Sequence, residues 1–274
     1  MSRPVTQLDK SDVLTGLFAS WDALDGLLSG LSEEQWRTPT PLPGWDVHAV
    51  VAHIIGTESA LSGVPTPDVD VSGLAHIRND FGATNECWVR HLRGEPGAEL
   101  HQRFLAVTRD RRKRLTDMSE DDWLAVTPTP AGPDSYGRFM RVRVFDCWMH
   151  EHDIRDGLGL PASEAELVSP AARLALDEMA ASMGYVVGKL GGAPDGSRVA
   201  IELTGPLARV IRVVVDGRGQ VVDDFGGLEP TATIRVDGLL FTRLAGGRVA
   251  GAPVELDGDH EVGARIVEHL NYVI

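Results

Sequence analysis

Residues 145–156 hold a dense group of side chains that could bind a metal ion: Phe-Asp-Cys-Trp-Met-His-Glu-His-Asp-Ile-Arg-Asp. Asp146 and His150 are four residues apart, so on a helix their side chains share one face, with Cβ atoms roughly 5–6 Å apart. Imidazole nitrogen and carboxylate oxygen are both ligands of zinc and similar divalent ions. The pair therefore makes half of a metal site, and a third ligand must come from elsewhere in the chain.

The best candidate for the third ligand is His53, at the end of the stretch Gly-Trp-Asp-Val-His-Ala-Val-Val-Ala-His (44–53). Asp46 is a good N-cap for a helix over about 47–62, and His53 falls beside the apolar stripe of that helix, so it can face the interior. Three protein ligands with a free position are the arrangement of a catalytic metal site. The plain alternative is a surface histidine and an ordinary helical Asp/His pair.

The residues around His150 suggest supporting roles. Asp153 lies three positions further on the same face, where it could accept a hydrogen bond from the imidazole, although Arg155 could pair with it instead. Glu151 or His152 could replace the carboxylate ligand, but both point well away round the helix. We therefore keep the original ligand assignment.

Several other residues have plainer interpretations. Glu58 lies within the apolar stripe of the second helix, which indicates a pair with an arginine inside the bundle more than a catalytic role. We expect His48 to cap or be solvated at the start of that helix. Cys147 is expected to pack in the core, and the basic stretch 109–114 is interpreted as a solvated helix face.

The elements that must position these residues follow from the hydrophobic pattern and the loops. Proline-rich loops separate helical patterns in the first part of the chain, which indicates an up-and-down helical bundle, and bundle cores are where facing helices assemble metal sites. The predicted helices span 9–30, 47–62, 74–92 and 137–157, and helical structure could resume after the break at 93–97 and run to 115.

The second part has a different composition and predicts a small α+β domain. Its expected elements are a helix over 164–190, strands over 199–204, 209–215, 220–222 and 232–236, a hairpin turn at 216–219, a short helix near 238–245, a strand at 254–256 and a last helix near 259–270. We therefore predict two domains, 1–162 and 163–274, in an α+β chain overall.

Bulk properties exclude several classes of protein. The net charge of −14 disfavours binding to a phosphate backbone, so no nucleic-acid partner is expected. No apolar run is long enough for a membrane span and no signal peptide is evident, so we expect a cytoplasmic protein without a membrane partner. The two cysteines, Cys87 and Cys147, exclude a disulfide framework and a four-cysteine zinc site. The scarcity of lysine beside arginine is typical of high-GC genomes, such as those of actinobacteria.

The two histidine-bearing stretches, 44–53 and 146–161, resemble the mycothiol-dependent maleylpyruvate isomerase family. The resemblance implies a DinB-like four-helix bundle, and the motifs at 232–238, 244–248 and 258–259 are similar to that family's small, sterol-carrier-like α+β C-terminal domain. In the family a histidine on the second helix and a Glu-x-x-x-His on the last helix of the bundle bind zinc. By position these match His53, Asp146 and His150, with Asp146 replacing the usual, longer Glu.

The resemblance also implies a function. It suggests a divalent-metal-dependent S-transferase or isomerase in which a mycothiol-type thiol is the co-substrate and its thiolate attacks a small electrophilic substrate. Zinc is the expected ion, and nickel or iron also suit this ligand set. The family uses an arginine of the C-terminal domain for an anionic substrate, and Arg248 and Arg243 are the candidate counterparts. The alternatives are a non-catalytic metal-binding protein whose C-terminal domain takes a hydrophobic or anionic ligand, and a metal-dependent hydrolase.

Overall fold

The computed structural model describes residues 5–74, 77, 79–130 and 132–273. The chain divides into two compact units, Met1–Ala162 and Ser163–Ile274, which are described separately below. The first unit is helical and the second combines helices with a five-stranded sheet, which confirms the predicted α+β class.

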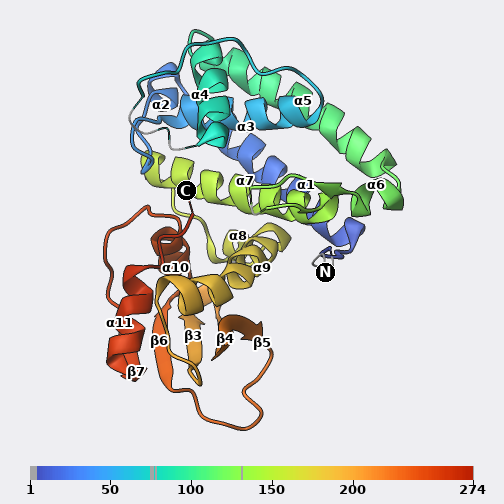
Figure 1. Cartoon of the computed structure of the whole chain (residues 1–274). Helices are drawn as coiled ribbons and strands as arrows, with labels where there is room; N and C mark the ends of the chain where they lie inside the picture. The colour runs from blue at the N-terminus through green and yellow to red at the C-terminus, as the bar shows by residue number, and fades with distance from the viewer. Residues whose placement is uncertain (1–4, 75–76, 78, 131, 274) are drawn as a thin grey trace. The chain divides into compact units, whose positions relative to one another are not determined.

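The first unit is built around four long helices. These are α1 (Lys10–Leu28), α3 (Val47–Leu61), α5 (Gly97–Asp117) and α7 (Tyr136–Leu158), coloured from blue to yellow-green in Figure 1. Helices α1 and α3 each pack against both α5 and α7. The shorter helices are α2 (Glu33–Trp36), α4 (Asp80–Leu92) and α6 (Glu120–Leu124). A short antiparallel pair, β1 (Val126–Thr127) and β2 (Asp134–Ser135), precedes α7.

Helix α3 packs against α2, α4, α5 and α7. It begins where the Asp46 carboxylate accepts a hydrogen bond from the backbone N–H of Ala49, as the N-cap pattern predicts. Its side chains are buried on nearly every side, and a helix that is apolar all round belongs in a core. The polar residues that it carries, His48, His53 and Glu58, are therefore forced into the interior.

Helix α7 supplies the opposite side of the site. Ser135 caps its first turn by accepting a hydrogen bond from the N–H of Arg138, and it ends at Gly159, whose φ of 66° is the left-handed conformation that glycine adopts without strain. This helix extends over the whole motif 145–156. The i, i+4 geometry expected of Asp146 and His150 is therefore present.

The second unit is a five-stranded sheet covered by helices. The strand order is β5-β4-β3-β6-β7, with β3 and β6 parallel and the other neighbours antiparallel. The elements are α8 (Glu164–Leu167), α9 (Pro170–Tyr185), the π-helical turn η1 (Val186–Leu190), β3 (Arg198–Thr204), η2 (Gly205–Leu207), β4 (Arg209–Asp216), β5 (Arg218–Val222), β6 (Ala232–Asp237), α10 (Gly238–Ala245), β7 (Glu255–Gly258) and α11 (His260–Glu268).

Two predicted helices differ from the structure. The helix expected over 164–190 is interrupted, because Ser169 caps a new helix with Pro170 in its first turn, the position at which proline is favoured. The helix expected from Leu74 begins only at Asp80, and residues 75, 76 and 78, including His76, lie outside the described residues.

One close approach fixes how α9 packs on the sheet. A Cβ atom on Gly219 in β5 would lie 2.1 Å from the carbonyl oxygen of Gly184 in α9, so only glycine fits there.

Among the described residues, no helix is both long and apolar enough to span a bilayer.

Candidate metal centre

The structure brings His53, Asp146 and His150 together inside the helical unit. One possible ligand atom from each, a ring nitrogen of either histidine and a carboxylate oxygen, lies within 4.8 Å of the others. His53 Nε2 is 3.2 Å from Asp146 Oδ2, and His150 Nε2 is 3.5 Å from Asp146 Oδ1. Helix α3 thus contributes one member and α7 two, from segments that are 93 residues apart.

The donor set fits a divalent ion. Ligands of tetrahedral zinc, with bonds of about 2.0–2.1 Å, are separated by roughly 3.4 Å. Each imidazole lies close to that distance from one of the two Asp146 oxygens, His53 from Oδ2 and His150 from Oδ1. The set is two imidazoles and one carboxylate, the composition of many catalytic sites. Asp146 reaches both imidazoles although its side chain is one methylene shorter than glutamate.

Asp153 orients His150, as the i, i+3 spacing predicts. Its Oδ2 lies 2.9 Å from His150 Nδ1, so the proton of a neutral imidazole is held there and Nε2 is left with its lone pair toward Asp146. Arg155 does not compete for this pairing through its Nε, which instead bonds Glu151 at 2.8 Å. Glu151 is thereby engaged elsewhere, which leaves Asp146 as the carboxylate of the cluster.

His53 is oriented differently. Its Nδ1 is buried without a hydrogen-bond partner among the described residues, so the side chain is held by the contact of Nε2 with Asp146 and by ring packing. The indole of Trp45 lies against both imidazoles, with ring centroids 5.3 Å from His53 and 6.2 Å from His150. The indole N–H points to Glu86 Oε2 at 3.4 Å. Trp45, which the sequence analysis did not place in the site, forms one of its walls.

The electrostatics of the cluster are uneven. Burial would raise the pKa of Asp146, but the charge of Arg143 and the two imidazoles outweigh it and hold that pKa well below its usual value. Burial lowers the pKa of His53 despite the opposing effect of Asp146. Burial would also lower the pKa of His150, but Asp146 and Asp153 together raise it to about 9. These shifts favour an ionised carboxylate on Asp146 beside a protonated imidazole on His150 at neutral pH.

A buried network extends from the cluster into the bundle. Glu58 is paired with an arginine, as its place in the apolar stripe predicts, and the structure supplies two. Arg111 Nε lies 2.9 Å from Glu58 Oε2, and Arg143 Nε lies 2.9 Å from Oε1. Arg143 Nη1 also bonds Asp146 Oδ2 at 2.5 Å. Glu58 is fully buried, and the side chains of Arg111 and Arg143 are 2% and 4% exposed.

Two expectations about this region are wrong. Arg111 was expected on a solvated face with the rest of 109–114, yet it is buried because its face of α5 meets α3. His48 was expected to cap or be solvated, yet it is fully buried, with Nε2 2.9 Å from the carbonyl oxygen of Glu95. Burial lowers its pKa below the usual value.

The thiol of Cys147 is a packing group, as expected. It is fully buried in α7, and burial raises its pKa to about 12, although Arg143 opposes the change. A thiol with this pKa is not ionised at neutral pH and is a poor nucleophile. Cys87 is also free and is half-buried.

Arg243 and Arg248 belong to the second unit. Arg243 lies in the last turn of α10, and its carbonyl accepts a hydrogen bond from the backbone N–H of Arg248 at 2.8 Å. Arg248 Nη1 also donates to the carbonyl oxygen of Gly246 at 2.6 Å. Both side chains are half-buried. Their part in a reaction remains a prediction.

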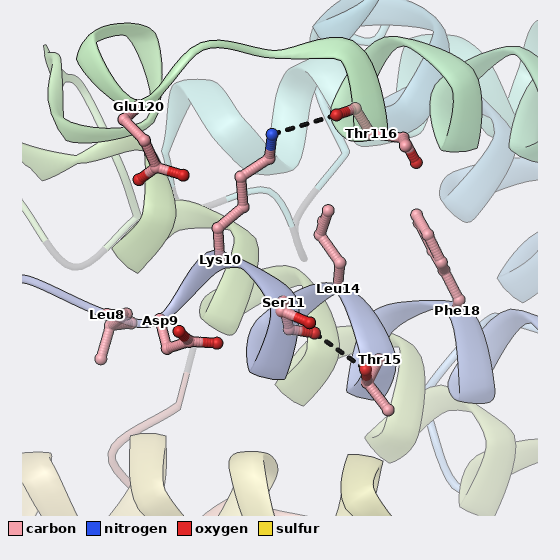
Figure 2. A pocket seen from close by; sticks show the side chains of 9 residues that line it. All are labelled: Leu8, Asp9, Lys10, Ser11, Leu14, Thr15, Phe18, Thr116 and Glu120. Carbon is pink, nitrogen blue, oxygen red and sulfur yellow. Dashed lines mark hydrogen bonds between the residues drawn. The ribbon is translucent and has the colours of Figure 1, made fainter.

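The helical unit also has a surface pocket of about 500 Å³ between the start of α1 and the end of α5 (Figure 2). Lys10 reaches across it to the carbonyl oxygen of Thr116 at 3.1 Å. Its lining contains no histidine and none of the clustered ligand residues: Leu8, Asp9, Lys10, Ser11, Leu14, Thr15, Phe18, Thr116 and Glu120.

Comparison with known proteins gives a consistent result. Residues 17–155 match the mycothiol maleylpyruvate isomerase N-terminal domain, and residues 173–265 match the C-terminal domain of the same family. An uncharacterized protein of Mycobacterium tuberculosis is 27% identical over 207 residues, which cover 72% of this chain and 75% of the relative; it matches equally in two strains.

Solved structures show the same fold at lower identity. The crystal structure of the mycothiol-dependent maleylpyruvate isomerase superposes with a TM-score of 0.60 at 17% identity, covering 91% of this chain and 93% of that one. A mutant of that isomerase gives a TM-score of 0.59 at 16% identity, covering 90% and 93%. The two domain matches together span most of the sequence, and the chain belongs to the mycothiol maleylpyruvate isomerase family.

Proposed function

We propose that this protein is a divalent-metal-dependent isomerase or S-transferase that uses a mycothiol-type thiol as co-substrate and acts on a small electrophile. The observation that supports it most is that His53, Asp146 and His150 each place a possible ligand atom within 4.8 Å of the others. Membership of the family adds the thiol, since mycothiol stands in the family's description. Zinc is the proposed ion, and nickel or iron suit the same ligands.

The chain's own residues have distinct tasks in this proposal. His53, Asp146 and His150 would hold the ion, and Asp153 keeps the His150 proton on Nδ1. Trp45 closes one side of the cluster and limits the access of water there. At such a site a divalent ion stabilises the thiolate form of a thiol whose free pKa is about 8.5.

An anionic substrate would require a cation outside the ligand set. Arg143 is already engaged with Glu58 and Asp146, so it is a poor candidate for binding substrate. We propose Arg248 and Arg243 for this task. Substituting either with Ala should raise the KM for an anionic electrophile and leave the bound metal unchanged, whereas loss of the metal would argue against the assignment.

The test begins with the metal content of protein purified without chelators. We expect close to one divalent ion per chain, lost in His53→Ala and His150→Ala. Formation of a thiol adduct or an isomerised product that depends on added mycothiol would support the proposal. Turnover with water alone would favour the hydrolase, and metal binding without turnover would favour a binding protein. A metal-free wild-type protein would contradict the proposal.

A further inference from the structure

Arg143 is shared between two carboxylates. Its Nε donates to Glu58 Oε1 at 2.9 Å, and its Nη1 donates to Asp146 Oδ2 at 2.5 Å. The side chain is 4% exposed, and Glu58 is fully buried. A guanidinium is planar, and its N–H groups point in fixed directions relative to one another. A carboxylate that accepts a hydrogen bond from Nε therefore determines the direction in which the Nη1 hydrogen points.

Glu58 is itself held from the other side. Arg111 Nε donates to Glu58 Oε2 at 2.9 Å, and Arg111 Nη2 bonds the hydroxyl of Tyr136 at 3.0 Å. Both oxygens of Glu58 are therefore occupied, and its side chain cannot rotate without breaking a buried pair. The order of contacts is Tyr136, Arg111, Glu58, Arg143, Asp146, which connects α5, α3 and α7.

We propose that Arg143 is a positioning residue: anchored by Glu58, it fixes the carboxylate of Asp146 in the orientation that faces both His53 and His150. This inference rests on the proposed metal centre. An aspartate has a short side chain whose carboxylate plane is free to turn, and the bond from Nη1 to Oδ2 removes that freedom. The same oxygen lies 3.2 Å from His53 Nε2, so the orientation of Oδ2 decides whether the α3 and α7 ligands can be used together.

A rival account treats Arg143 as a positive charge that competes with the ion for Asp146. The two accounts predict opposite effects of changing Arg143. The geometry favours positioning, because Arg143 donates to Asp146 from a guanidinium that Glu58 already holds in place. Arg143→Lys would keep the positive charge and lose the planar arrangement of N–H donors that contacts Glu58 and Asp146 together.

The experiment compares two matched variants of the full-length protein, Arg143→Lys and Arg111→Lys. Both keep the charge and both disturb one bond to Glu58, but only Arg143 touches Asp146. The readouts are Co²⁺ affinity, measured by competition with a chelator, and the visible absorption spectrum of bound Co²⁺, which reports ligand geometry. We expect Arg143→Lys to bind Co²⁺ roughly 10–100-fold more weakly with an altered spectrum. Arg111→Lys, which reaches Asp146 only through Glu58 and Arg143, should change both readouts much less.

The outcomes separate this inference from the proposed function. Wild-type protein that binds no Co²⁺ would overturn both. Wild-type binding with an Arg143→Lys affinity and spectrum equal to those of Arg111→Lys would overturn the positioning role and leave the metal centre standing, and tighter binding by Arg143→Lys would establish the competing charge instead. If Arg143→Lys does not fold, Glu58→Gln loosens the anchor of Arg143 and must alter the Co²⁺ spectrum; an unchanged spectrum would again overturn the positioning role.

Discussion

His150 Nδ1 lies 2.9 Å from Asp153 Oδ2, one turn further along α7. Because both residues are on the same helix, the orientation of the imidazole is set by local geometry and needs no second element. Among the described residues His53 has no partner on Nδ1, and its ring is held by the contact of Nε2 with Asp146 on another helix and by the packing of Trp45 and His150. The two histidines of the cluster should therefore respond differently to changes around them.

Replacing Asp153 with Asn should weaken metal binding. The amide is a poorer acceptor for the Nδ1 proton, and its NH₂ group can instead donate to Nδ1 and move the imidazole proton to Nε2, where the ion would bind. We expect a loss of roughly 10–100-fold in affinity for Zn²⁺ or Co²⁺, measured by competition with a chelator. Asp110→Asn, at an exposed position of α5, should leave the affinity unchanged. Equal affinities in the two variants would show that Asp153 does not orient the ligand.

Metal binding should release a proton. The pKa of His150 is raised to about 9, because Asp146 and Asp153 outweigh burial, so without metal the ring is protonated below that pH. Asp146 stays ionised because its pKa is lowered, and the lowered pKa of His53 keeps that ring neutral above about 6.5. Between about pH 6.5 and 8.5 the apparent affinity should therefore rise about tenfold per pH unit.

Calorimetric titration in two buffers of different ionisation enthalpy measures this release directly. We expect about one proton per ion at pH 7. The release should disappear in His150→Ala, in which any residual binding carries no proton from this ring. A flat affinity profile in the wild type would mean that His150 is neutral before the ion binds.

Removing the Glu58 carboxylate should destabilise the helical unit. Glu58→Ala leaves Arg111 and Arg143 buried beside each other without their shared partner. The breaking of a buried ion pair costs about 3–5 kcal/mol, which we expect as a shift in urea-induced unfolding followed by circular dichroism. Glu99→Ala, at an exposed position of α5, should change stability by no more than about 0.5 kcal/mol. A loss below about 1 kcal/mol for Glu58→Ala would imply that water replaces the carboxylate.

Substituting Gly219 should destabilise the second unit. A Cβ atom there would lie 2.1 Å from the carbonyl oxygen of Gly184, and backbone on both sides leaves no flexible side chain to move. We expect Gly219→Ala to cost about 1–3 kcal/mol or more through overpacking, seen as a lower thermal midpoint. Gly26→Ala in α1 has nothing within 4 Å and should be neutral or stabilising by up to about 1 kcal/mol. A Gly219→Ala midpoint equal to wild type would mean that α9 shifts freely on the sheet.

Much of the fold follows from periodicity and end signals. The patterns at 9–30 and 137–157 correspond to α1 and α7 within a few residues, since each has a side-chain N-cap and an apolar face. The parallel pairing of β3 with β6 was not predicted, because strand order depends on contacts between distant segments. The interruption of the helix 164–190 had a local signal, the Ser-Pro pair at 169–170, that the helical pattern of the surrounding residues obscured.

The ligand candidates of the site could be predicted from the sequence, but most of the residues that hold those ligands in place could not. The i, i+4 spacing identified the helix face that Asp146 and His150 share. The position of the Glu58 carboxylate in an apolar stripe indicated that an arginine pairs with it. Neither pattern could say that Arg111 and Arg143 fill that place, because the burial of a charged residue depends on which helix its face meets. One signal was available for Arg143: it precedes Asp146 by three residues and so shares its face.

His53 and Asp146 are 93 positions apart in the sequence, which has a further consequence for the stability of the helical unit. An ion bound by ligands from both α3 and α7 would be a reversible cross-link that closes a long loop, in a chain whose two cysteines are both free. A cross-link that closes a long loop restricts the unfolded chain and so stabilises the folded state. Removing the ion with a chelator should therefore lower the thermal midpoint of the helical unit. The midpoint of the sheet-bearing unit, which contains none of the three ligands, should not change.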